Sequence, residues 1–499
     1  MLFSSPIFLL AFLPLFLLVY FLLPKRFRNF FLMLASVFFY TWGEGKLVAI
    51  MLTSSFVDFL AGITIAGGWK NWRDPIKQLD PNGPRTRKQK ITLAVSLLAN
   101  IAFLGFFKYF NFGIDNFNAF MGTLGLENAM LTNITAITLP LGISFYTFQS
   151  MSYTIDVYRG HATATRHYFN FVAFVTMFPQ LVAGPIIRYA DVAREIAHRI
   201  VTREKFASGV QRFAVGLGKK MLIANIVAVP ADKLFTFPVS DLSALLAWIG
   251  VISYALQIYF DFSGYSDMAI GMGRMLGFEF LENFNYPYIS RSIREFWRRW
   301  HISMSTWFRD YLYIPLGGNR KSGTRTFVNL LVVFSITGLW HGASWNFVVW
   351  GLFHGVFMML ERTVVGRWLD RAWRPIQHLY VLLIVLIGWV FFRANSLENA
   401  IAYLQSMVGM GSGVVGDISQ YVDPYFLVVV VIGIIGSAPI LKWCKRVIGH
   451  YVTTASNGRA LAIHISTHVV TIFMVIALLG ASLMLMAHDT YNPFIYFRF

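Results

Sequence analysis

The chain has 499 residues, of which 56% are hydrophobic, 17% aromatic and only 13% charged, and its mean hydropathy is +0.57. This composition excludes an ordinary soluble globular protein. The formal net charge of +18 would suit a nucleic-acid-binding protein, but the basic residues stand in short connections between apolar segments, which is typical of cytoplasmic loops. We therefore predict a protein that is surrounded by membrane lipids and binds no nucleic acid.

Apolar stretches recur along the whole chain. A spanning helix needs about 20 apolar residues. Stretches of that kind lie at 6–23, 46–67, 91–110, 135–155, 208–230, 244–270, 377–393, 425–441 and 461–487, with shorter candidates at 29–42, 168–187 and within 326–361. Pro179, Gly184 and Pro185 interrupt the segment 168–187, which predicts a re-entrant segment shielded by protein. We expect one all-α membrane domain over 1–499, with about a dozen spanning or re-entrant helices.

The distribution of basic residues predicts the topology. The basic runs begin at Lys25, Lys70, Arg188, Arg291, Arg362 and Lys442, and the positive-inside rule places them in the cytoplasm. Both termini are then extracytoplasmic, including the tail 488–499, while the Pro-rich strip 70–90 is a cytoplasmic connection. The single cysteine, Cys444, excludes an intramolecular disulfide.

Polar and aromatic residues crowd beside apolar segments between residues 254 and 355, where we expect an interfacial catalytic region. Intramembrane polar groups are costly and usually functional. Asp261 and Asp267 lie in YFDFSGYSDMAIG, at the cytoplasmic end of the predicted span 244–270. These carboxylates could orient a histidine, or they could form a structural ion pair.

The stretch 290–320, SRSIREFWRRWHISMSTWFRDYLYIPLGGNR, predicts an interfacial helix that continues as far as Pro315. On helical spacing its tryptophans gather on one face, while Arg294, Arg298 and His301 fall on another. Guanidinium groups bind phosphate oxygens in a bidentate manner, so the arginines could hold the phosphates of an acyl donor. Binding of lipid headgroups would explain the same arginines equally well.

The sharpest single feature is GLWHGASWNFVVWGLFHG at 338–355, where His341 stands between Trp340 and Gly342. A charged imidazole would be costly inside this apolar run, so we expect a neutral His341 that can act as a general base. A packing or proton-relay role is the alternative. Gly342 would allow close approach of a substrate or another backbone segment. His354 does not stand at a metal-ligand spacing from His341, so we expect no metal site.

Several long motifs together resemble the membrane-bound O-acyltransferase family, in its bacterial polysaccharide branch. They are FSSPIFL, LPLGISFYTFQSMSYTIDVYRG, FPQLVAGPIIR, DFSGYSDMAIG, ENFNYPYIS, EFWRRWHISMSTWFRDYLYIPLGGNR, GLWHG and NPFIYFRF. The resemblance implies a shallow funnel pierced by a thin passage. It also implies an acyltransferase of the bacterial inner membrane that takes acetyl from cytoplasmic acetyl-CoA to an exopolysaccharide outside. Alginate is the first expectation for this acceptor, and cellulose is another candidate.

The resemblance also assigns roles to residues. It implies that His341 is catalytic, with His301 as the second histidine of the family. Arg294, Trp297, Arg298, Arg309 and Asn319 would bind the donor, and Asp261, Asp267 and Trp340 would support the site. The tail implies an acyl relay at Tyr496, followed by transfer to an extracytoplasmic serine esterase-like partner subunit. Alternatively, the tail aromatics anchor the terminus at the membrane interface. Arg498 stands where the resemblance would place a glutamine.

Two other classes of function fit parts of the pattern. A transporter or flippase of a lipid-linked sugar or an acyl donor would also need a cavity, buried carboxylates and basic entrances. However, no pair of similar halves, as many secondary transporters have, is visible in the sequence. A non-catalytic subunit that recruits the partner esterase is the third reading.

Overall fold

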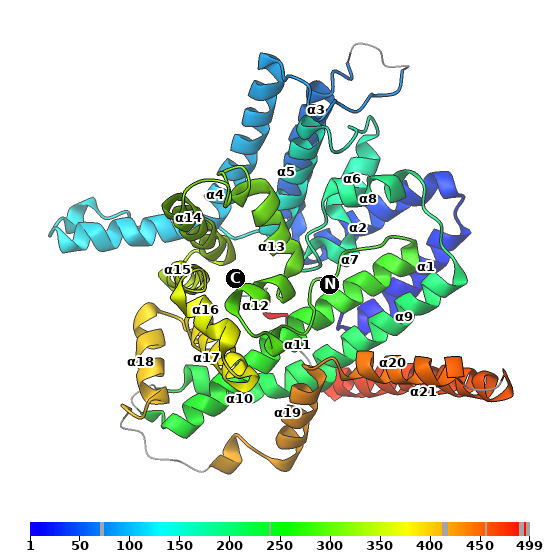
Figure 1. Cartoon of the computed structure of the whole chain (residues 1–499). Helices are drawn as coiled ribbons and strands as arrows, with labels where there is room; N and C mark the ends of the chain where they lie inside the picture. Colours follow the sequence, from blue (N-terminus) through cyan, green and yellow to red (C-terminus); the bar gives the residue numbers. More distant parts are fainter. Residues whose placement is uncertain (70–73, 239–240, 412–417, 455–456, 489–493, 496–499) are drawn as a thin grey trace. The chain divides into compact units, whose positions relative to one another are not determined.

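The computed structural model describes residues 1–69, 74–238, 241–411, 418–454, 457–488 and 494–495. Every regular element within these ranges is helical (Figure 1). The predicted all-α class is therefore confirmed. Residue contacts divide the chain into two compact units, one made of 1–207 with 272–281 and the other of 208–271 with 282–499.

The first unit contains the helices from the N-terminus to α8. They are η1 (Phe8–Phe12), α1 (Leu13–Leu22), η2 (Lys25–Phe27), α2 (Arg28–Glu44), η3 (Gly45–Leu47), α3 (Val48–Ile65), α4 (Arg87–Thr123), η4 (Glu127–Ala129), α5 (Ile143–Arg159), α6 (Tyr168–Thr176), α7 (Phe178–Leu181) and α8 (Tyr189–Ala197). Between α6 and α7 the helix breaks at Met177, and residues 171–187 are all buried. Protein therefore shields the irregular backbone of the predicted re-entrant segment.

A buried polar network joins α3, α4 and α5 in this unit. The carboxylate of Asp58 accepts hydrogen bonds from Ser96 Oγ at 2.6 Å and from Asn100 Nδ2 at 2.8 and 2.9 Å. Ser150 on α5 donates to the same carboxylate. These donors satisfy the carboxylate of Asp58. Helix α5 can therefore pack over Asp58 and be buried along almost its whole length without leaving a buried carboxylate unsatisfied.

The second unit contains the remaining helices. Residues 203–207 of α9 belong to the first unit. They are α9 (Arg203–Gly218), η5 (Lys219–Ala224), α10 (Asn225–Thr236), α11 (Ala244–Leu276), η7 (Pro287–Ile289), α12 (Ile293–Arg299), α13 (Ile302–Phe308), η8 (Arg309–Tyr313), α14 (Gly323–His341), α15 (Trp345–Leu360), α16 (Val364–Arg371), α17 (Arg374–Arg393), α18 (Leu397–Met407), η9 (Ile418–Gln420), α19 (Pro424–Gly436), α20 (Ile440–Thr454) and α21 (Asn457–His488). Residues 272–276 of α11 belong to the first unit.

Helices α14 and α15 pack closely against each other in the second unit (Figure 1). The contact depends on Gly338, because a Cβ there would lie only 2.1 Å from the carbonyl oxygen of Phe347. At Gly342, which follows α14, a Cβ would lie 2.1 Å from the ring of Phe347. The close approach expected at Gly342 therefore comes from a phenylalanine side chain of α15.

Within the described ranges, six helices are long and apolar enough to cross a membrane, or eight if each of two bent pairs forms one span. The six are Lys25–Ile65, Arg87–Thr123, Arg203–Thr236, Ala244–Leu276, Arg374–Arg393 and Gly458–His488. The first bent pair joins α15 and α16 at 74°, and the second joins α19 and α20 at 56°. Shorter or broken apolar helices, such as Phe8–Leu22 and α6 with α7, occupy other predicted segments. The chain is a polytopic membrane protein.

Candidate functional site

The stretch that was expected to form one interfacial helix up to Pro315 is broken in the middle. Helix α12 ends at Arg299, and α13 begins at Ile302. His301 stands between them with φ of 43°, in the left-handed region that costs an ordinary residue about 1–2 kcal/mol. The prediction of one helix was therefore wrong, because helical periodicity does not reveal a single left-handed residue. Trp297 and Trp300 of this stretch are buried in protein.

The imidazole of His301 is held by the amide of Asn283. The Oδ1 atom of Asn283 accepts hydrogen bonds from the backbone N–H of Ser303 at 3.2 Å and from Ser303 Oγ at 2.9 Å. Because a backbone N–H can only donate, it identifies that atom as the oxygen. The same oxygen lies 3.1 Å from His301 Nδ1, so Nδ1 carries the proton. The Nε2 atom of neutral His301 therefore presents a lone pair.

His301 is fully buried. Burial lowers its pKa to about 3, because a charged imidazole would lose its hydration. The ring is therefore neutral throughout the physiological range.

His341 is the last residue of α14, and aromatic rings from three helices surround it. Its ring centroid lies 4.9 Å from that of Trp340, 5.0 Å from that of Trp350 on α15 and 5.3 Å from that of Phe392 on α17. Only 3% of the residue is exposed, so the imidazole faces protein and not lipid. The ring centroids of His341 and His301 are 6.5 Å apart. The fold thus brings the two expected histidines together, although α14 and the α12–α13 break are separate elements.

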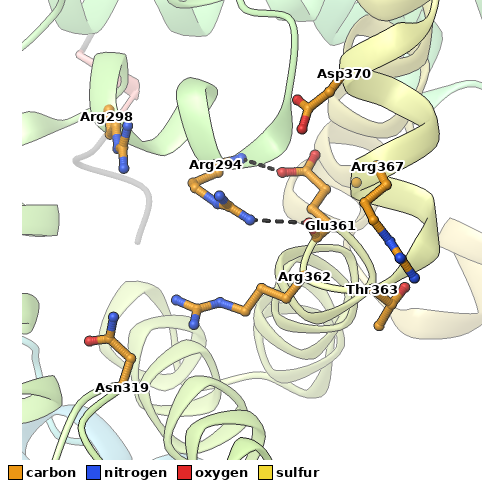
Figure 2. A pocket seen from close by; sticks show the side chains of 9 residues that line it. Arg294, Arg298, Asn319, Glu361, Arg362, Thr363, Arg367 and Asp370 are labelled. Carbon is orange, nitrogen blue, oxygen red and sulfur yellow. Dashed lines mark hydrogen bonds between the residues drawn. The ribbon is translucent and has the colours of Figure 1, made fainter.

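A hollow of about 420 Å³ collects charged side chains from α12, the segment before α14, and the bend between α15 and α16 (Figure 2). It is lined by Arg294, Arg298, Asn319, Glu361, Arg362, Thr363, Gly366, Arg367 and Asp370. Three of the residues expected to bind the donor, Arg294, Arg298 and Asn319, therefore share one pocket. Four arginines against two carboxylates favour an anionic ligand with several charges.

Glu361 anchors the helix that carries two of these arginines. Its carboxylate accepts hydrogen bonds from the backbone N–H groups of Ile293 and Arg294, the first two residues of α12. The side chain of Arg294 in turn donates to the carbonyl oxygen of Glu361 at 3.1 Å (Figure 2). A carboxylate at a helix N-terminus satisfies orphan donors and opposes the helix dipole. Glu361 thus holds α12 against the α15–α16 bend.

Trp297 connects the pocket to the histidines. It stands on α12 between Arg294 and Arg298, and its ring lies 5.7 Å from that of Trp350 and 5.2 Å from that of His354. Trp350 contacts His341 on its other side. One aromatic residue therefore separates Trp297 from the imidazole of His341. Arg309 lies apart from the pocket lining: its side chain is 57% exposed and pairs with Asp310 at 2.6 Å.

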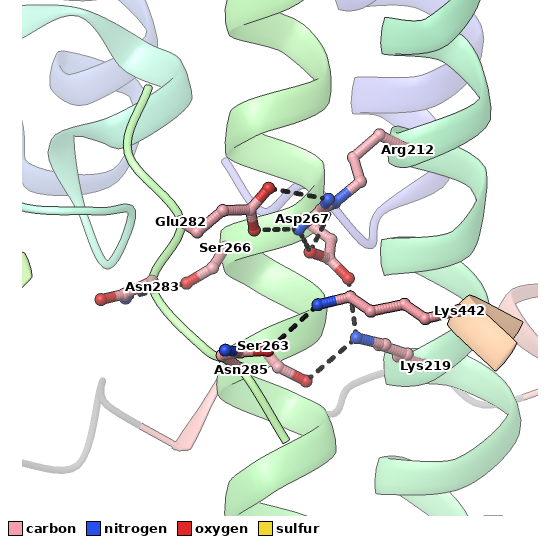
Figure 3. Close-up of polar contacts among 9 residues, drawn as sticks. All are labelled: Arg212, Lys219, Ser263, Ser266, Asp267, Glu282, Asn283, Asn285 and Lys442. Carbon is pink, nitrogen blue, oxygen red and sulfur yellow. Dashed lines mark hydrogen bonds and ion pairs between the residues drawn. The ribbon is translucent and has the colours of Figure 1, made fainter. Parts of the chain in front are cut away.

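Asp267 belongs to an ion-pair cluster on α9, η5 and α11 (Figure 3). Its carboxylate lies 2.6 Å from Arg212 and 2.7 Å from Lys219, and Arg212 also pairs with Glu282 at 2.5 Å. Next to this cluster, Asn283 Nδ2 donates to Ser266 Oγ at 3.1 Å. The cluster therefore fixes the segment that begins at Glu282, and that segment carries the amide that holds His301.

Asp261 lies in the middle of α11 and not at a helix end, because α11 continues to Leu276. It forms a buried ion pair with Lys220 at 2.6 Å. Its other carboxylate oxygen accepts a hydrogen bond from the backbone N–H of Ile495 at 2.7 Å. The relay candidate Tyr496 follows Ile495 directly and lies outside the described residues.

Reasoning from the sequence missed several residues of this site. Asn283 lies within ENFNYPYIS, but a single asparagine carries no signal for a histidine 18 positions away. Arg362 and Arg367 lie in a basic stretch that was interpreted only as a topology signal, and Glu361 directly precedes it. The bend after Leu360 turns that stretch towards α12, and a sequence pattern does not show this bend.

Comparison with known proteins identifies the family of this chain. The model of the "membrane-bound O-acyltransferase family" matches residues 161–397 of the sequence. The chain is 41% identical to "Probable alginate O-acetylase AlgI" of Azotobacter vinelandii over the full length of both proteins. It is 44% identical to the protein of the same name in Pseudomonas aeruginosa, over 84% of this chain and 77% of that one.

A relative with a different printed name, "Peptidoglycan O-acetyltransferase" of Helicobacter pylori, is 34% identical over 82% of this chain and 80% of that protein. The likeness therefore extends beyond proteins named for alginate. The full-length similarity agrees with two structural observations: two adjacent buried histidines and a polytopic helical fold. The chain is thus an acyltransferase that belongs to the membrane-bound O-acyltransferase family.

Proposed function

We propose that this protein transfers acetyl from acetyl-CoA, on the cytoplasmic side of the bacterial inner membrane, towards an exopolysaccharide outside, with alginate as the acceptor polymer. The observation that carries the proposal is the buried His301–His341 pair, with ring centroids 6.5 Å apart. Through Trp350 and Trp297 this pair adjoins an arginine-lined pocket. Acyl transfer from a charged thioester requires a neutral base and an anion site of this kind.

The pocket would hold the phosphates of coenzyme A. Arg294, Arg298 and Arg362 lie around one hollow in Figure 2, with Asn319 opposite Arg362. Guanidinium groups bind phosphate oxygens with paired hydrogen bonds. With the phosphates bound there, Trp297 and Trp350 would direct the thioester end towards His341. Arg309, which pairs with Asp310 and is not part of the pocket lining, would contribute little to donor binding.

His341 would act as the general base. Its neutral imidazole takes the proton of the acceptor hydroxyl while the hydroxyl oxygen attacks the thioester carbonyl carbon. The tetrahedral intermediate then collapses, the carbon–sulfur bond breaks, and the thiolate of coenzyme A takes up the proton. The Nε2 lone pair of neutral His301 would orient the hydroxyl. The buried indole N–H of Trp350, which has no hydrogen-bond partner among the described residues, is our candidate for stabilising the oxyanion.

The route beyond the membrane follows from the topology that the charges predict, with both termini and the acceptor outside. In our proposal Tyr496 accepts the acetyl group, and an extracytoplasmic serine esterase-like subunit completes transfer to the polymer. Alginate is favoured as the acceptor because the chain matches "Probable alginate O-acetylase AlgI" of Azotobacter vinelandii over its full length at 41% identity. Its likeness to the peptidoglycan O-acetyltransferase is 34% over 82% of the chain.

The test compares His341→Ala with His464→Ala in cells that export the polymer. His464 is an exposed histidine on α21, so its replacement controls for the loss of an imidazole outside the site. We expect His341→Ala to abolish the polymer acetyl signal in NMR spectra, with unchanged protein level and polymer export, and His464→Ala to retain it. Full acetylation in the His341→Ala strain would contradict the proposal.

A second measurement separates the enzyme from the rival functions. Purified protein, supplied with acetyl-CoA, acceptor and partner subunit, should release free thiol, and His341→Ala should not. A transporter would instead move an intact solute, with no thiol released. A recruiting subunit would release no free thiol from acetyl-CoA, even with its partner and acceptor supplied, and would move no solute.

A further inference from the structure

Phe494 and Ile495, the last described residues of the chain, lie inside the second unit, against the middle of α11. Phe494 and Ile495 are each only 3% exposed. The ring of Phe494 lies 4.7 Å from that of Tyr265 and 5.9 Å from that of Phe262. Phe494 therefore packs in protein and not in an aromatic belt at the membrane surface. Figure 1 shows this short red segment beside α11.

The anchor of this segment is an ion pair. Lys220 and Asp261 have side chains that are only 4% and 2% exposed, and their charged atoms lie 2.6 Å apart. One carboxylate oxygen of Asp261 faces Lys220, while the other accepts the Ile495 N–H at 2.7 Å. Asp261 lies about 25 Å from the start and about 22 Å from the end of the 33-residue α11. A buried pair at this depth contributes little to stability by itself, so it needs another reason to be present.

The docked segment adjoins the histidine pair. Phe262 follows Asp261 on α11, and its ring contacts Phe494 on one side and His301 on the other, at 4.7 Å from the imidazole centroid. His301 in turn adjoins His341. A single phenylalanine therefore separates the C-terminal segment from the imidazoles.

We propose that the Lys220–Asp261 pair is the receptor for the chain's own C-terminal tail, and that docking of Ile495 there holds the tail at the histidine pair for acyl transfer. Asp261 is then a positioning residue, since it acts through the tail. The docking itself stands on the contacts above, whereas its effect on transfer rests on the proposed function. The donor pocket lies on other elements, so loss of docking should lower turnover and leave the KM for acetyl-CoA unchanged.

Two changes remove the docking from opposite sides. Ile495→Pro deletes the backbone N–H that Asp261 accepts, while Ile495→Val retains it and is the matched control. The double variant Lys220→Met with Asp261→Leu replaces the pair by apolar side chains of similar size, which should preserve folding because no charge remains buried alone. Both should lower kcat about 10-fold or more, because the tail loses a charge-assisted hydrogen bond. Ile495→Val should retain normal turnover.

Docking is also measured without catalysis. In a Cys444→Ser background, Ile495→Cys keeps the N–H and introduces a thiol at a buried position. We expect this thiol to be protected from a membrane-impermeant maleimide, and to become reactive when the Lys220→Met and Asp261→Leu changes are added. Equal labelling in both backgrounds would overturn the docking. Undiminished kcat in Ile495→Pro and in the double variant would overturn its role in transfer. Failure of the proposed function would appear separately, as full acetylation in His341→Ala.

Discussion

Replacing Asn283 by leucine tests whether one amide sets the state of His301. In the native site the Asn283 oxygen accepts from His301 Nδ1, from the backbone N–H of Ser303 and from Ser303 Oγ. Leucine has a similar volume and accepts no hydrogen bond. The backbone N–H of Ser303 and His301 Nδ1 would then lose this partner in a buried site.

The magnitude follows from these contacts. A buried donor that loses its acceptor costs about 1–3 kcal/mol, so Asn283→Leu should lower the free energy of unfolding by about 2–6 kcal/mol for the two groups. Without Asn283 the proton of neutral His301 is free to move to Nε2. If the lost preference is about 1.4 kcal/mol, the ratio of the active tautomer to the other tautomer falls about tenfold. We expect kcat to fall with the population of the active tautomer, and the KM for acetyl-CoA to change less.

The assay is thiol release from acetyl-CoA by purified protein, with thermal unfolding measured in parallel. Asn285→Leu is the matched control, because Asn285 is an exposed residue of the same segment whose side chain accepts only from Lys442 among the contacts described. Asn283→Asp keeps the accepting oxygen, but its negative charge raises the pKa of His301. That variant should be active at high pH and lose activity as the pH falls and Nε2 is protonated. Folded Asn283→Leu protein with native kcat would refute the reasoning.

Three further predictions concern the donor pocket, the glycine after α14 and pH. Arg362→Gln should raise the KM for acetyl-CoA about 10-fold or more by removing a charge-assisted contact. The control Arg371→Gln, on α16 but outside the pocket lining, should leave this KM unchanged. Steady-state kinetics measures both constants, and a lower kcat with an unchanged KM in Arg362→Gln would contradict the prediction. Gly342→Ala should destabilise the protein by about 1–3 kcal/mol, because its Cβ would meet the Phe347 ring at 2.1 Å; adding Phe347→Leu should restore the thermal midpoint, and no rescue would argue against this clash. Since the pKa of His301 is about 3 in the fold and about 6.5 in an unfolded chain, the unfolded state gains a proton below pH 6.5 that the folded state does not take up. Stability should therefore fall as pH decreases, by about 2 kcal/mol between pH 6.5 and pH 5 for this group; unfolding of His301→Gln should show a shallower pH dependence, and equal slopes would contradict the buried neutral state.

Composition and hydrophobic patterning alone determined the class of the protein. Apolar segments long enough to span a bilayer must be helical, since a lone helix satisfies its own backbone hydrogen bonds in lipid. The break expected in 168–187 was also legible, because proline and glycine interrupt a helix wherever they occur. His341 and Arg294 could be singled out because charged or titratable groups are rare in apolar surroundings.

The tertiary structure decided how these residues are held. Asn283 and Glu361 act on His301 and on α12 through hydrogen bonds between positions far apart in the chain, and no local periodicity encodes such pairs. The left-handed residue at His301 opposes the helical propensity of its neighbours, and only the surrounding packing can impose it. The place of Ile495 against Asp261 likewise arises because a buried carboxylate needs donors, and the fold alone determines which part of the chain supplies them.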